Sequence, residues 1–507
     1  MENLGNIITN HSEKSPDKWA IKFGDAQYSF LELENLANNI AHFLKEKYKV
    51  SKGDRVVIIS KKSTELIASI IAIWKLGAIY VPADFNNGIN RLKYILDDIK
   101  PCLIISSKKY LEEFQSVIQP IPTISYSEIG LLPVAKSEKF HEELDGNEIA
   151  SIFYTSGSTG RPKGVCLNHK SMTHYFHAEN ELLKINNEST SINFGPFHFD
   201  VCVQDTFIPL YFGASVYILD GLLIPEIITD IIHKNNVTHL ICVSSVLSLI
   251  TPAADEFDSL KSSNLKACMT GGEVCNPALI NLWLEKIPGF QIFNGYGPTE
   301  CNSLCMAYHI KTPDTTRKGP YPIGTCFMGC IAHLIDAHGN VIHEDNVVGT
   351  LVIGGKQLMN GYWNLPEETE KAFIIIDNEK YYITGDLSKR DEKGEYSFEG
   401  RMDKEVKILG RRINLNEIRN SLLNLPYVEY AFVDAFDVND RKKIYAYVYG
   451  TNLESNIDEH QINGLLRKEL PVYMIPERVI ISKQIPKTST NKVYEKEIKK
   501  LIVNQIS

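Results

Sequence analysis

The chain has 507 residues, more than one hydrophobic core usually supports, and this length predicts at least two domains. Its hydrophobic and charged fractions, 44% and 23%, are those of an ordinary globular protein and argue against extended disorder. The net charge of -9, without any Lys/Arg cluster in the sequence, argues against a protein that binds nucleic acid.

The sequence predicts a cytoplasmic protein that does not cross a membrane. Its first residues include acids and lack the apolar segment of a signal peptide. The most apolar stretch, residues 66–83, contains Lys75 and Gly77 and falls short of the roughly 20 apolar residues that span a bilayer. The ten cysteines form no CxxC pair and have no His at metal-ligand spacing, so we expect reduced thiols.

Two sets of alternating helices and strands follow one another along the first 300 or so residues. In the first set, a helical stretch at 30–48 precedes β-branched runs at 54–60, 78–83 and 102–107. In the second set, runs at 214–219, 238–244, 265–272 and 290–297 end in Gly or polar residues. Each set predicts a parallel sheet, and ligands bind at the carboxyl edge of such sheets.

The remainder of the chain changes character twice. From about residue 320, short strands and turns predict a β-rich subdomain, and an α+β segment of about a hundred residues follows. The charged run at 401–405 is our candidate hinge. The predicted fold class is therefore α/β, with a large N-terminal domain (1–402) of two parallel-sheet subdomains plus a β-rich subdomain, and a small mobile α+β C-terminal domain (403–507).

The stretch "YTSGSTGRPKGV", residues 154–165, has the composition of a phosphate-binding loop. Backbone N–H groups converge on phosphate oxygens where glycines leave room, and hydroxyls and a lysine add donors. It is not a Walker A loop, which requires G-x-x-x-x-G-K-[ST]. Such a cluster alone is more often a surface loop, so its meaning depends on the motifs that accompany it.

Six motifs in order resemble those of the adenylate-forming superfamily of acyl-CoA synthetases, luciferases and nonribosomal peptide synthetase adenylation domains. They are "YTSGSTGRPKG", "NGYGPTE" (294–300), "YYITGD" (381–386), "GRMDKEVKILGRRI" (400–413), "LPVYMIP" (470–476) and "PKTSTNKV" (486–493). The resemblance implies that a carboxylate attacks the α-phosphate of ATP with Mg²⁺ as cofactor, that pyrophosphate leaves, and that the acyl group passes to a thiol.

The resemblance also implies a role for each matching residue. The catalytic residues would be Lys492, Thr299 and Lys407, with Glu300 holding Mg²⁺ and Asp403 at the hinge, where the small domain rotates between the two steps. The ATP-binding residues would be Thr155, Ser156, Gly157, Ser158, Thr159, Gly160, Lys163, Gly272, Glu273, Asn294, Tyr296, Gly297, Asp386 and Arg401. In place of the family's usual Gly before the catalytic lysine the chain has Asn491, which also tolerates a left-handed backbone.

"FGPFHFDVCVQD" carries the signal for the substrate. In amino-acid-activating relatives the Asp of an "FD" pair binds the substrate ammonium, and Asp200 occupies that position. Asp200 could instead cap a helix that begins at Val201. The remaining pocket residues expected from the resemblance are Val201, Gln204, Val246, Met269, Gly271, Gly295, Ser303 and Leu304. None is charged, which predicts a neutral amino acid. Asp200, Val201 and Gln204 resemble the start of proline-activating pockets, so L-proline is expected first and another neutral amino acid second, with D-alanine third by resemblance to stand-alone D-alanine ligases.

The acceptor is expected to be the phosphopantetheine thiol of a separate carrier protein, because the chain ends soon after Lys492 and leaves no room for a fused carrier domain. Coenzyme A is the rival acceptor. An acyl- or aryl-CoA ligase is the rival enzyme, in which Asp200 is structural and His198 guards an acyl tunnel. A catalytically inactive nucleotide-binding or scaffolding protein is the alternative from a different class.

Overall fold

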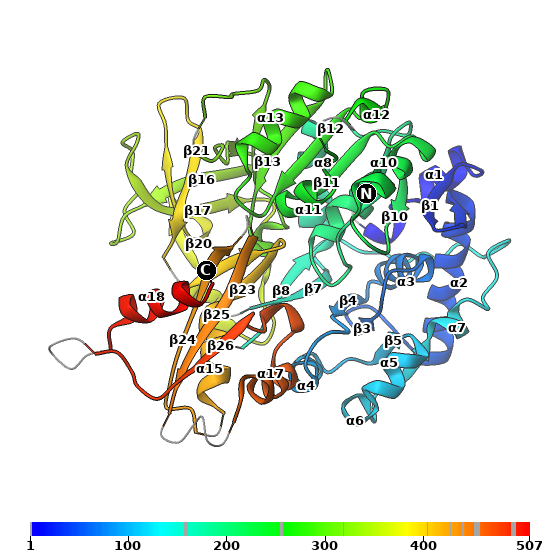
Figure 1. Cartoon of the computed structure of the whole chain (residues 1–507). Helices are drawn as coiled ribbons and strands as arrows, with labels where there is room; N and C mark the ends of the chain where they lie inside the picture. Colours follow the sequence, from blue (N-terminus) through cyan, green and yellow to red (C-terminus); the bar gives the residue numbers. More distant parts are fainter. Residues whose placement is uncertain are drawn as a thin grey trace.

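Two large mixed sheets with helices packed over them form most of the structure, a computed structural model of the chain (Figure 1). It describes residues 3–156, 161–253, 257–317, 319–402, 404–425, 427–438, 441–450, 457–487 and 493–506. In these ranges no helix is both long and apolar enough to cross a membrane.

The first sheet has seven strands, and its core is parallel as the sequence predicts. Its spatial order is β18 (Gly361–Tyr362), β8 (Lys163–Asn168), β7 (Ile149–Thr155), β4 (Ile79–Ala83), β3 (Arg55–Ile59), β5 (Leu103–Ser106) and β6 (Thr123–Ser125). The helices between these strands are α3 (Thr64–Lys75), α4 (Ile89–Ile99), α5 (Lys108–Glu113), α6 (Gln115–Ile118) and α7 (Tyr126–Ile129). At the β8 and β18 end of the sheet the pairing is antiparallel.

The second sheet has nine strands, six of them parallel. Its spatial order is β15 (Thr325–Cys326), β14 (Met306–Ile310), β13 (Gln291–Tyr296), β12 (Ala267–Gly271), β11 (His239–Val243), β9 (Thr190–Asn193), β10 (Ser215–Ile218), β1 (Trp19–Phe23) and β2 (Ala26–Ser29). Its helices include α8 (His169–Leu183), α10 (Pro225–Lys234), α11 (Ser244–Leu249), α12 (Asp258–Lys261) and α13 (Pro277–Lys286).

The first strands of the chain supply one edge of this second sheet. Strands β1 and β2 follow a short helical segment, η1 (Leu4–Asn6) and α1 (Thr9–Lys14), and precede α2 (Phe30–Tyr48). The α2 helix begins at a capping box in which the Ser29 hydroxyl accepts from the Glu32 N–H and the Glu32 carboxylate accepts from the Ser29 N–H. It packs on α3, which is buried along nearly its whole length.

A five-stranded antiparallel sheet follows, as predicted from the short strands beyond residue 320. Its strands are β16 (Cys330–Ile335), β17 (Val348–Gly355), β20 (Glu379–Arg390) and β19 (Phe373–Ile376), with β21 (Tyr396–Arg401) paired to β20 and α14 (Pro366–Lys371) preceding β19. The fold class, α/β with two largely parallel sheets and a β-rich part, is therefore confirmed.

The last hundred or so residues form an α+β part with apolar clusters of its own. Its elements are the hairpin β22 (Glu405–Ile408) and β23 (Arg411–Asn414), the sheet β24 (Tyr430–Val438), β25 (Arg441–Tyr449) and β26 (Arg478–Ser482), and the helices α15 (Leu415–Leu423), α17 (Glu459–Glu469), η4 (Val472–Met474) and α18 (Glu495–Ile506). The boundary at 402/403 stays a prediction, and Asp403 lies outside the described residues.

Helices α4, α15 and α17 join this part to the first sheet. Arg91 on α4 forms a buried ion pair with Glu417 on α15. A Cβ on Gly88, just before α4, would lie 2.5 Å from the carbonyl oxygen of Lys468 on α17, so the two backbones are in close contact. In Figure 1, α15 and α17 accordingly lie beside α4.

Candidate active site

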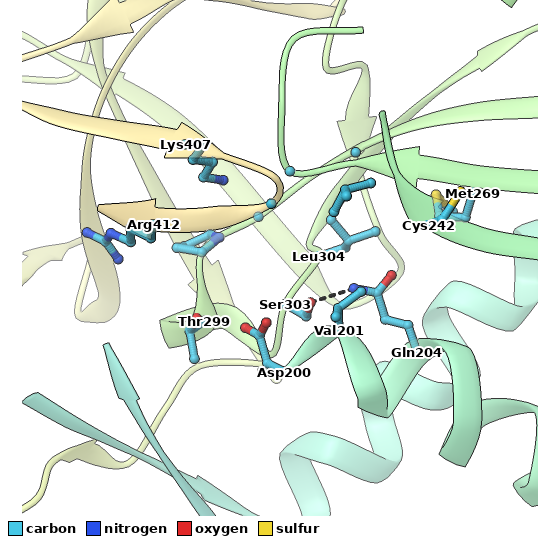
Figure 2. A pocket seen from close by; sticks show the side chains of 16 residues that line it. Asp200, Val201, Gln204, Cys242, Met269, Thr299, Ser303, Leu304, Lys407 and Arg412 are labelled. Carbon is cyan, nitrogen blue, oxygen red and sulfur yellow. Dashed lines mark hydrogen bonds between the residues drawn. The ribbon is translucent and has the colours of Figure 1, made fainter. Parts of the chain in front are cut away.

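A cavity of about 70 Å³ lies where β11, β12 and β13 end, at the carboxyl edge of the nine-stranded sheet (Figure 2). This is the edge at which open α/β sheets bind ligands. It brings together residues from several distant segments that the sequence predicted as site residues: Asp200, Val201, Gln204, Met269, Gly271, Gly272, Gly297, Thr299, Ser303, Leu304 and Lys407.

The loop that carries Asp200 is anchored by the fully buried Asp205 in the π-helical turn η2 (Val203–Phe207). Asp205 Oδ2 accepts hydrogen bonds from the backbone N–H groups of Phe194 (2.9 Å) and Gly195 (2.7 Å). Its Oδ1 accepts from Asn193 Nδ2 at 2.7 Å. Burial raises the pKa of Asp205 to about 6, although the nearby charge of Lys62 acts against the rise. The buried Asp205 therefore holds the start of the loop in place, and Asp200 lies farther along the loop, at the cavity.

Asp200 is half-buried at the wall of the cavity, opposite Lys407 across the opening (Figure 2). Burial raises the pKa of the Asp200 carboxyl, while a hydrogen bond from Thr299 and the charge of Lys407 act against that rise. A carboxylate in such a position gains most from a cationic partner that enters the cavity.

Gln204 and Ser303 close the far side of the cavity with a hydrogen bond of 2.5 Å from Gln204 Nε2 to Ser303 Oγ (Figure 2). Beside them lie Met269, Leu304 and Cys242. The wall is thus polar at one point and apolar around it.

Two expected pocket residues, Val246 and Gly295, are not among the residues that line this cavity. Val246 packs against the core cluster of the second sheet, and Cys242 and Val243, which the sequence analysis missed, line the cavity instead. Gly295 lies behind the wall, where a Cβ would meet Leu304 Cδ1 at 2.6 Å and Met269 Sδ at 3.1 Å. The sequence could have indicated Cys242 and Val243, because they stand at the end of β11, at the same sheet edge as the other cavity residues.

Three of the residues expected around adenosine, Tyr296, Asp386 and Arg401, are connected by hydrogen bonds. The Tyr296 hydroxyl donates to Asp386 Oδ2, and Arg401 donates to Asp386 Oδ1 at 2.5 Å. Asn294 Nδ2 donates to the carbonyl oxygen of Pro322 at 2.7 Å. Asp386, on β20, therefore has its carboxylate held beside the Tyr296 ring by two neighbours.

The residues expected around the phosphates are placed in part. Gly157, Ser158, Thr159 and Gly160 lie outside the described residues. Thr155 ends β7, and the adjoining Ser156 donates from Oγ to the carbonyl oxygen of Arg412 at 2.9 Å. Lys163 Nζ lies 2.7 Å from Glu368 Oε2, so this lysine is paired with a carboxylate of the protein.

Glu300, the expected Mg²⁺ ligand, is 1% exposed and already faces a cation. Arg412 Nη1 donates to both of its carboxylate oxygens, at 3.1 and 3.0 Å, and the Tyr362 hydroxyl donates to Oε1 at 2.8 Å. Burial acts to raise the pKa of Glu300, but the charge of Arg412 and the hydrogen bonds outweigh it and hold the pKa below the usual value. No group of three or more His, Cys, Asp or Glu side chains fit for a metal occurs in the described part of the chain.

The β22–β23 hairpin brings Arg412 and Lys407 to the cavity. The Gly410 N–H donates to Glu273 Oε1 at 2.9 Å, and Glu273 Oε2 accepts from the Ser245 N–H at 3.0 Å. Lys407 Nζ lies 5.9 Å from the centre of the Tyr296 ring. Glu273, expected at ATP, thus joins the hairpin to the second sheet.

Two of the predicted residues, Lys492 and Asp403, lie outside the described residues. Arg412, by contrast, contacts the site but was not among the predicted residues, although it stands in the motif that contains Arg401 and Lys407. The sequence feature that could have indicated Arg412 is the pair of arginines in "GRRI", where Arg411 and Arg412 directly follow the turn at Gly410.

Comparison with known sequences gives a consistent result. The model of the family described as AMP-binding enzyme matches residues 8–363. Bacitracin synthase 2 of Bacillus licheniformis is 31% identical over 496 residues, 96% of this chain and 18% of that protein. Gramicidin S synthase 1 of Brevibacillus brevis is 29% identical over 495 residues, 97% of this chain and 44% of that protein. The chain spans less than half the length of these curated relatives.

Solved structures share the architecture over nearly the whole chain. An NRPS protein containing adenylation and PCP domains superposes with a TM-score of 0.85 at 22% identity, covering 98% of this chain and 84% of that one. The o-succinylbenzoate CoA synthetase from Bacillus subtilis superposes with a TM-score of 0.83 at 20% identity, covering 98% of both chains. At such identities the likeness shows the fold alone.

Proposed function

Because the chain belongs to the AMP-binding enzyme family, we propose that it activates a neutral amino acid as aminoacyl-AMP and transfers it to a thiol. In the first step a carboxylate oxygen attacks the α-phosphorus of ATP and pyrophosphate leaves. The observation that carries this proposal is the half-buried Asp200 at the cavity wall, opposite Lys407. A fatty or aryl acid has no ammonium with which to pair that carboxylate.

The rest of the cavity favours a small, uncharged side chain. A volume of about 70 Å³ is small for a ligand pocket. The basic residues of the cavity wall, Lys407 and Arg412, belong to the hairpin. They lie on the side opposite Gln204 and Met269, so they do not offer a charge to a substrate side chain on that side (Figure 2). L-Proline is our first candidate, another neutral amino acid the second and D-alanine the third.

The nucleotide would lie beside the cavity. Tyr296 would stack on adenine, Asp386 would accept from the ribose hydroxyls and Thr299 would donate to phosphate, while the other ATP-binding residues keep the roles that the resemblance gives them. Mg²⁺ would supply positive charge to the phosphates, and Glu300, a buried acidic oxygen donor, suits it. Lys492 keeps its predicted role, in which its ammonium bridges the carboxylate and the α-phosphate.

The acceptor we favour is the phosphopantetheine thiol of a separate carrier protein. The similarity to bacitracin and gramicidin S synthases and to a solved adenylation–PCP protein supports it. The similarity in fold to a CoA synthetase supports the rival, coenzyme A. His198, the residue that would guard an acyl tunnel in that rival, does not line the cavity; its Nε2 lies 3.4 Å from Asp84 Oδ2.

ATP–pyrophosphate exchange tests the proposal directly. The panel contains L-proline, D-alanine, larger neutral amino acids, and aliphatic and aryl acids without an amine. We expect exchange with a small neutral amino acid and none with its deaminated analogue. Exchange only with acids that lack an amine would refute amino acid activation and support a CoA ligase, whereas no exchange with any acid would support a protein without catalytic activity.

A further inference from the structure

Lys62 connects the first sheet to the segment from which the Asp200 loop starts. It lies half-buried between β3 and α3, and its Nζ donates to the carbonyl oxygens of Asn193 (3.2 Å), Phe194 (2.9 Å) and Leu219 (2.8 Å). We propose that Lys62 is a positioning residue of the amino acid site, which holds the loop so that Asp200 faces the substrate's ammonium. The inference rests on the proposed function for the assignment of Asp200 to that ammonium.

The first support is that the start of the loop is held on both sides of its backbone. Asp205, on η2, accepts from the N–H groups of Phe194 and Gly195. Lys62, from the first sheet, donates to the carbonyl oxygens of Asn193 and Phe194. A carbonyl group that is shielded from water and loses its donor is costly, so removal of Lys62 loosens the side that Asp205 does not hold.

The second support is the match between the ammonium and its acceptors. A lysine ammonium has three N–H donors, and three carbonyl oxygens at the carboxyl ends of β9 and β10 accept from Lys62. Burial lowers the pKa of Lys62 to about 8, while the charges of Asp205 and Asp220 oppose the fall, so the side chain is charged at pH 7. A group with fewer donors, such as an amide, leaves at least one of the three carbonyl groups unpaired.

The third support is the rigid base from which Lys62 reaches the loop. The next residue, Ser63, caps the N-terminus of α3 with its side chain, and α3 is buried along nearly its whole length. Tyr80, on β4 of the same sheet, donates to the carbonyl oxygen of Phe197 at 2.8 Å, so the first sheet also holds the loop shortly before Asp200. Lys62 therefore acts on Asp200 through a loop that is fixed to the first sheet at two points.

The kinetics of pyrophosphate exchange give the first test. Lys62→Met removes the three donors at a similar side-chain length. It should raise the KM for the amino acid about tenfold or more, because a displacement of about 1 Å at a site can cost about 100-fold. The KM for ATP should stay unchanged, because the residues expected at the nucleotide belong to other elements. Lys62→Arg keeps the charge and the donors and should restore most of the amino acid KM.

The matched control is Lys61→Met, which changes the exposed neighbouring lysine and should leave both KM values unchanged. An unchanged amino acid KM in Lys62→Met, or an equal rise in the KM for the amino acid and for ATP, would overturn the proposal. Lys62→Gln, which keeps the two donors of an amide, carries the same test if Lys62→Met does not fold, with a smaller rise in the amino acid KM expected.

Hydrogen exchange of the full chain without substrates gives the second test. Peptides that cover 193–201 should exchange faster in Lys62→Met than in wild type and in Lys61→Met, while peptides that cover β12 should exchange equally in all three. Equal exchange at 193–201 would contradict the positioning role. Because this experiment contains no amino acid, its failure refutes the role of Lys62 alone, whereas failure of every amino acid in the pyrophosphate exchange panel refutes the proposed function.

Discussion

Under the proposed function, Asp200 is the side chain that would pair with the substrate's amino group. It belongs to a loop whose inner end is fixed by Asp205, so its carboxylate faces the cavity without reorganisation. A preorganised carboxylate offers an ammonium group a better environment than water does, because its surroundings are already oriented.

Asp200→Asn should lower kcat/KM for the amino acid roughly 100-fold while ATP affinity stays unchanged, because the ammonium would lose its charged partner. Since the pKa of Asp200 is raised, its charged form is lost earlier than that of an ordinary Asp as the pH falls. The wild-type kcat/KM should therefore decline on the acidic side, and Asp200→Asn should lack this decline. Initial rates of pyrophosphate exchange between pH 5 and 8 measure both effects; an unchanged kcat/KM in the variant would refute the role of Asp200.

Glu179 offers a test of stability, since its carboxylate is fully buried and forms no ion pair among the described residues, with only the Tyr175 hydroxyl acting to lower its pKa. Burial raises its pKa to about 8. A carboxyl group whose pKa is higher in the folded than in the unfolded state stabilises the fold below its unfolded pKa, near 4.5, and that contribution is lost as the pH rises through about 8.

Glu179→Gln should therefore unfold at a higher urea concentration than wild type at pH 8, by about 2 kcal/mol or more in unfolding free energy, and the difference should shrink towards pH 5. Urea titrations of both proteins at pH 5, 6.5 and 8 measure the difference. Glu181→Gln is the control on the same helix, because Glu181 is exposed and pairs with the exposed Lys184. A constant difference across the pH range would contradict the raised pKa.

At the scale of elements, the β22–β23 hairpin is the part that connects the α+β segment to the cavity. Its turn places Leu409 at φ +52° and Gly410 at φ +73°, the left-handed conformations of a two-residue hairpin turn. The tip is in close contact with β11, because a Cβ on Gly410 would lie 2.5 Å from Val243 Cγ1.

Gly410→Ala should slow transfer to the thiol about tenfold, because a methyl group at the tip hinders docking, while adenylation continues. Gly394→Ala is the matched control: Gly394 has φ +81°, but a Cβ there meets nothing within 4 Å. Single-turnover transfer from preformed aminoacyl-AMP measures the effect, and Val243→Ala should restore part of the rate. Equal losses in the two Ala variants would mean that backbone strain, and not contact with Val243, is responsible.

Local patterns predicted the individual elements well. The helix expected at 30–48 is α2, because a capping box at Ser29 and an apolar stripe agree on its start and face. The sequence did not reveal that β1 pairs with β10, because such pairing depends on sheet order and not on local periodicity. For the same reason the packing of Val246 against the core, and the contact of Arg412 with Glu300, 112 positions apart, escaped detection.

At the scale of the whole molecule, the α+β part has apolar clusters of its own and contacts the rest through the β22–β23 hairpin and through helices α15 and α17. The Arg91–Glu417 ion pair joins α4 to α15 and is buried on both sides. Burial raises the pKa of Glu417 even though the charge of Arg91 opposes the rise. Loss of one partner leaves the other buried without a counter-charge.

Glu417→Gln should lower the melting temperature of the α+β part by about 5 °C or more and leave the main unfolding transition unchanged. Differential scanning calorimetry of the full chain measures both transitions. Glu469→Gln is the control, because Glu469 contacts Asn90 of the same helix α4 at an exposed position. A single transition that shifts as a whole in Glu417→Gln would show that the two parts unfold as one unit.

The edges of the two large sheets have a consequence for synthesis on the ribosome. Strand β1 (Trp19–Phe23) pairs with β10 (Ser215–Ile218), and β18 (Gly361–Tyr362) pairs with β8 (Lys163–Asn168). Strand β1 must therefore wait for nearly 200 further residues before β10 emerges, and the first sheet is completed only after the second has been translated. Neither sheet can therefore be completed before translation of the other has begun. A nascent chain that ends before about residue 360 lacks β18, so the backbone of β8 has no partner strand on that side.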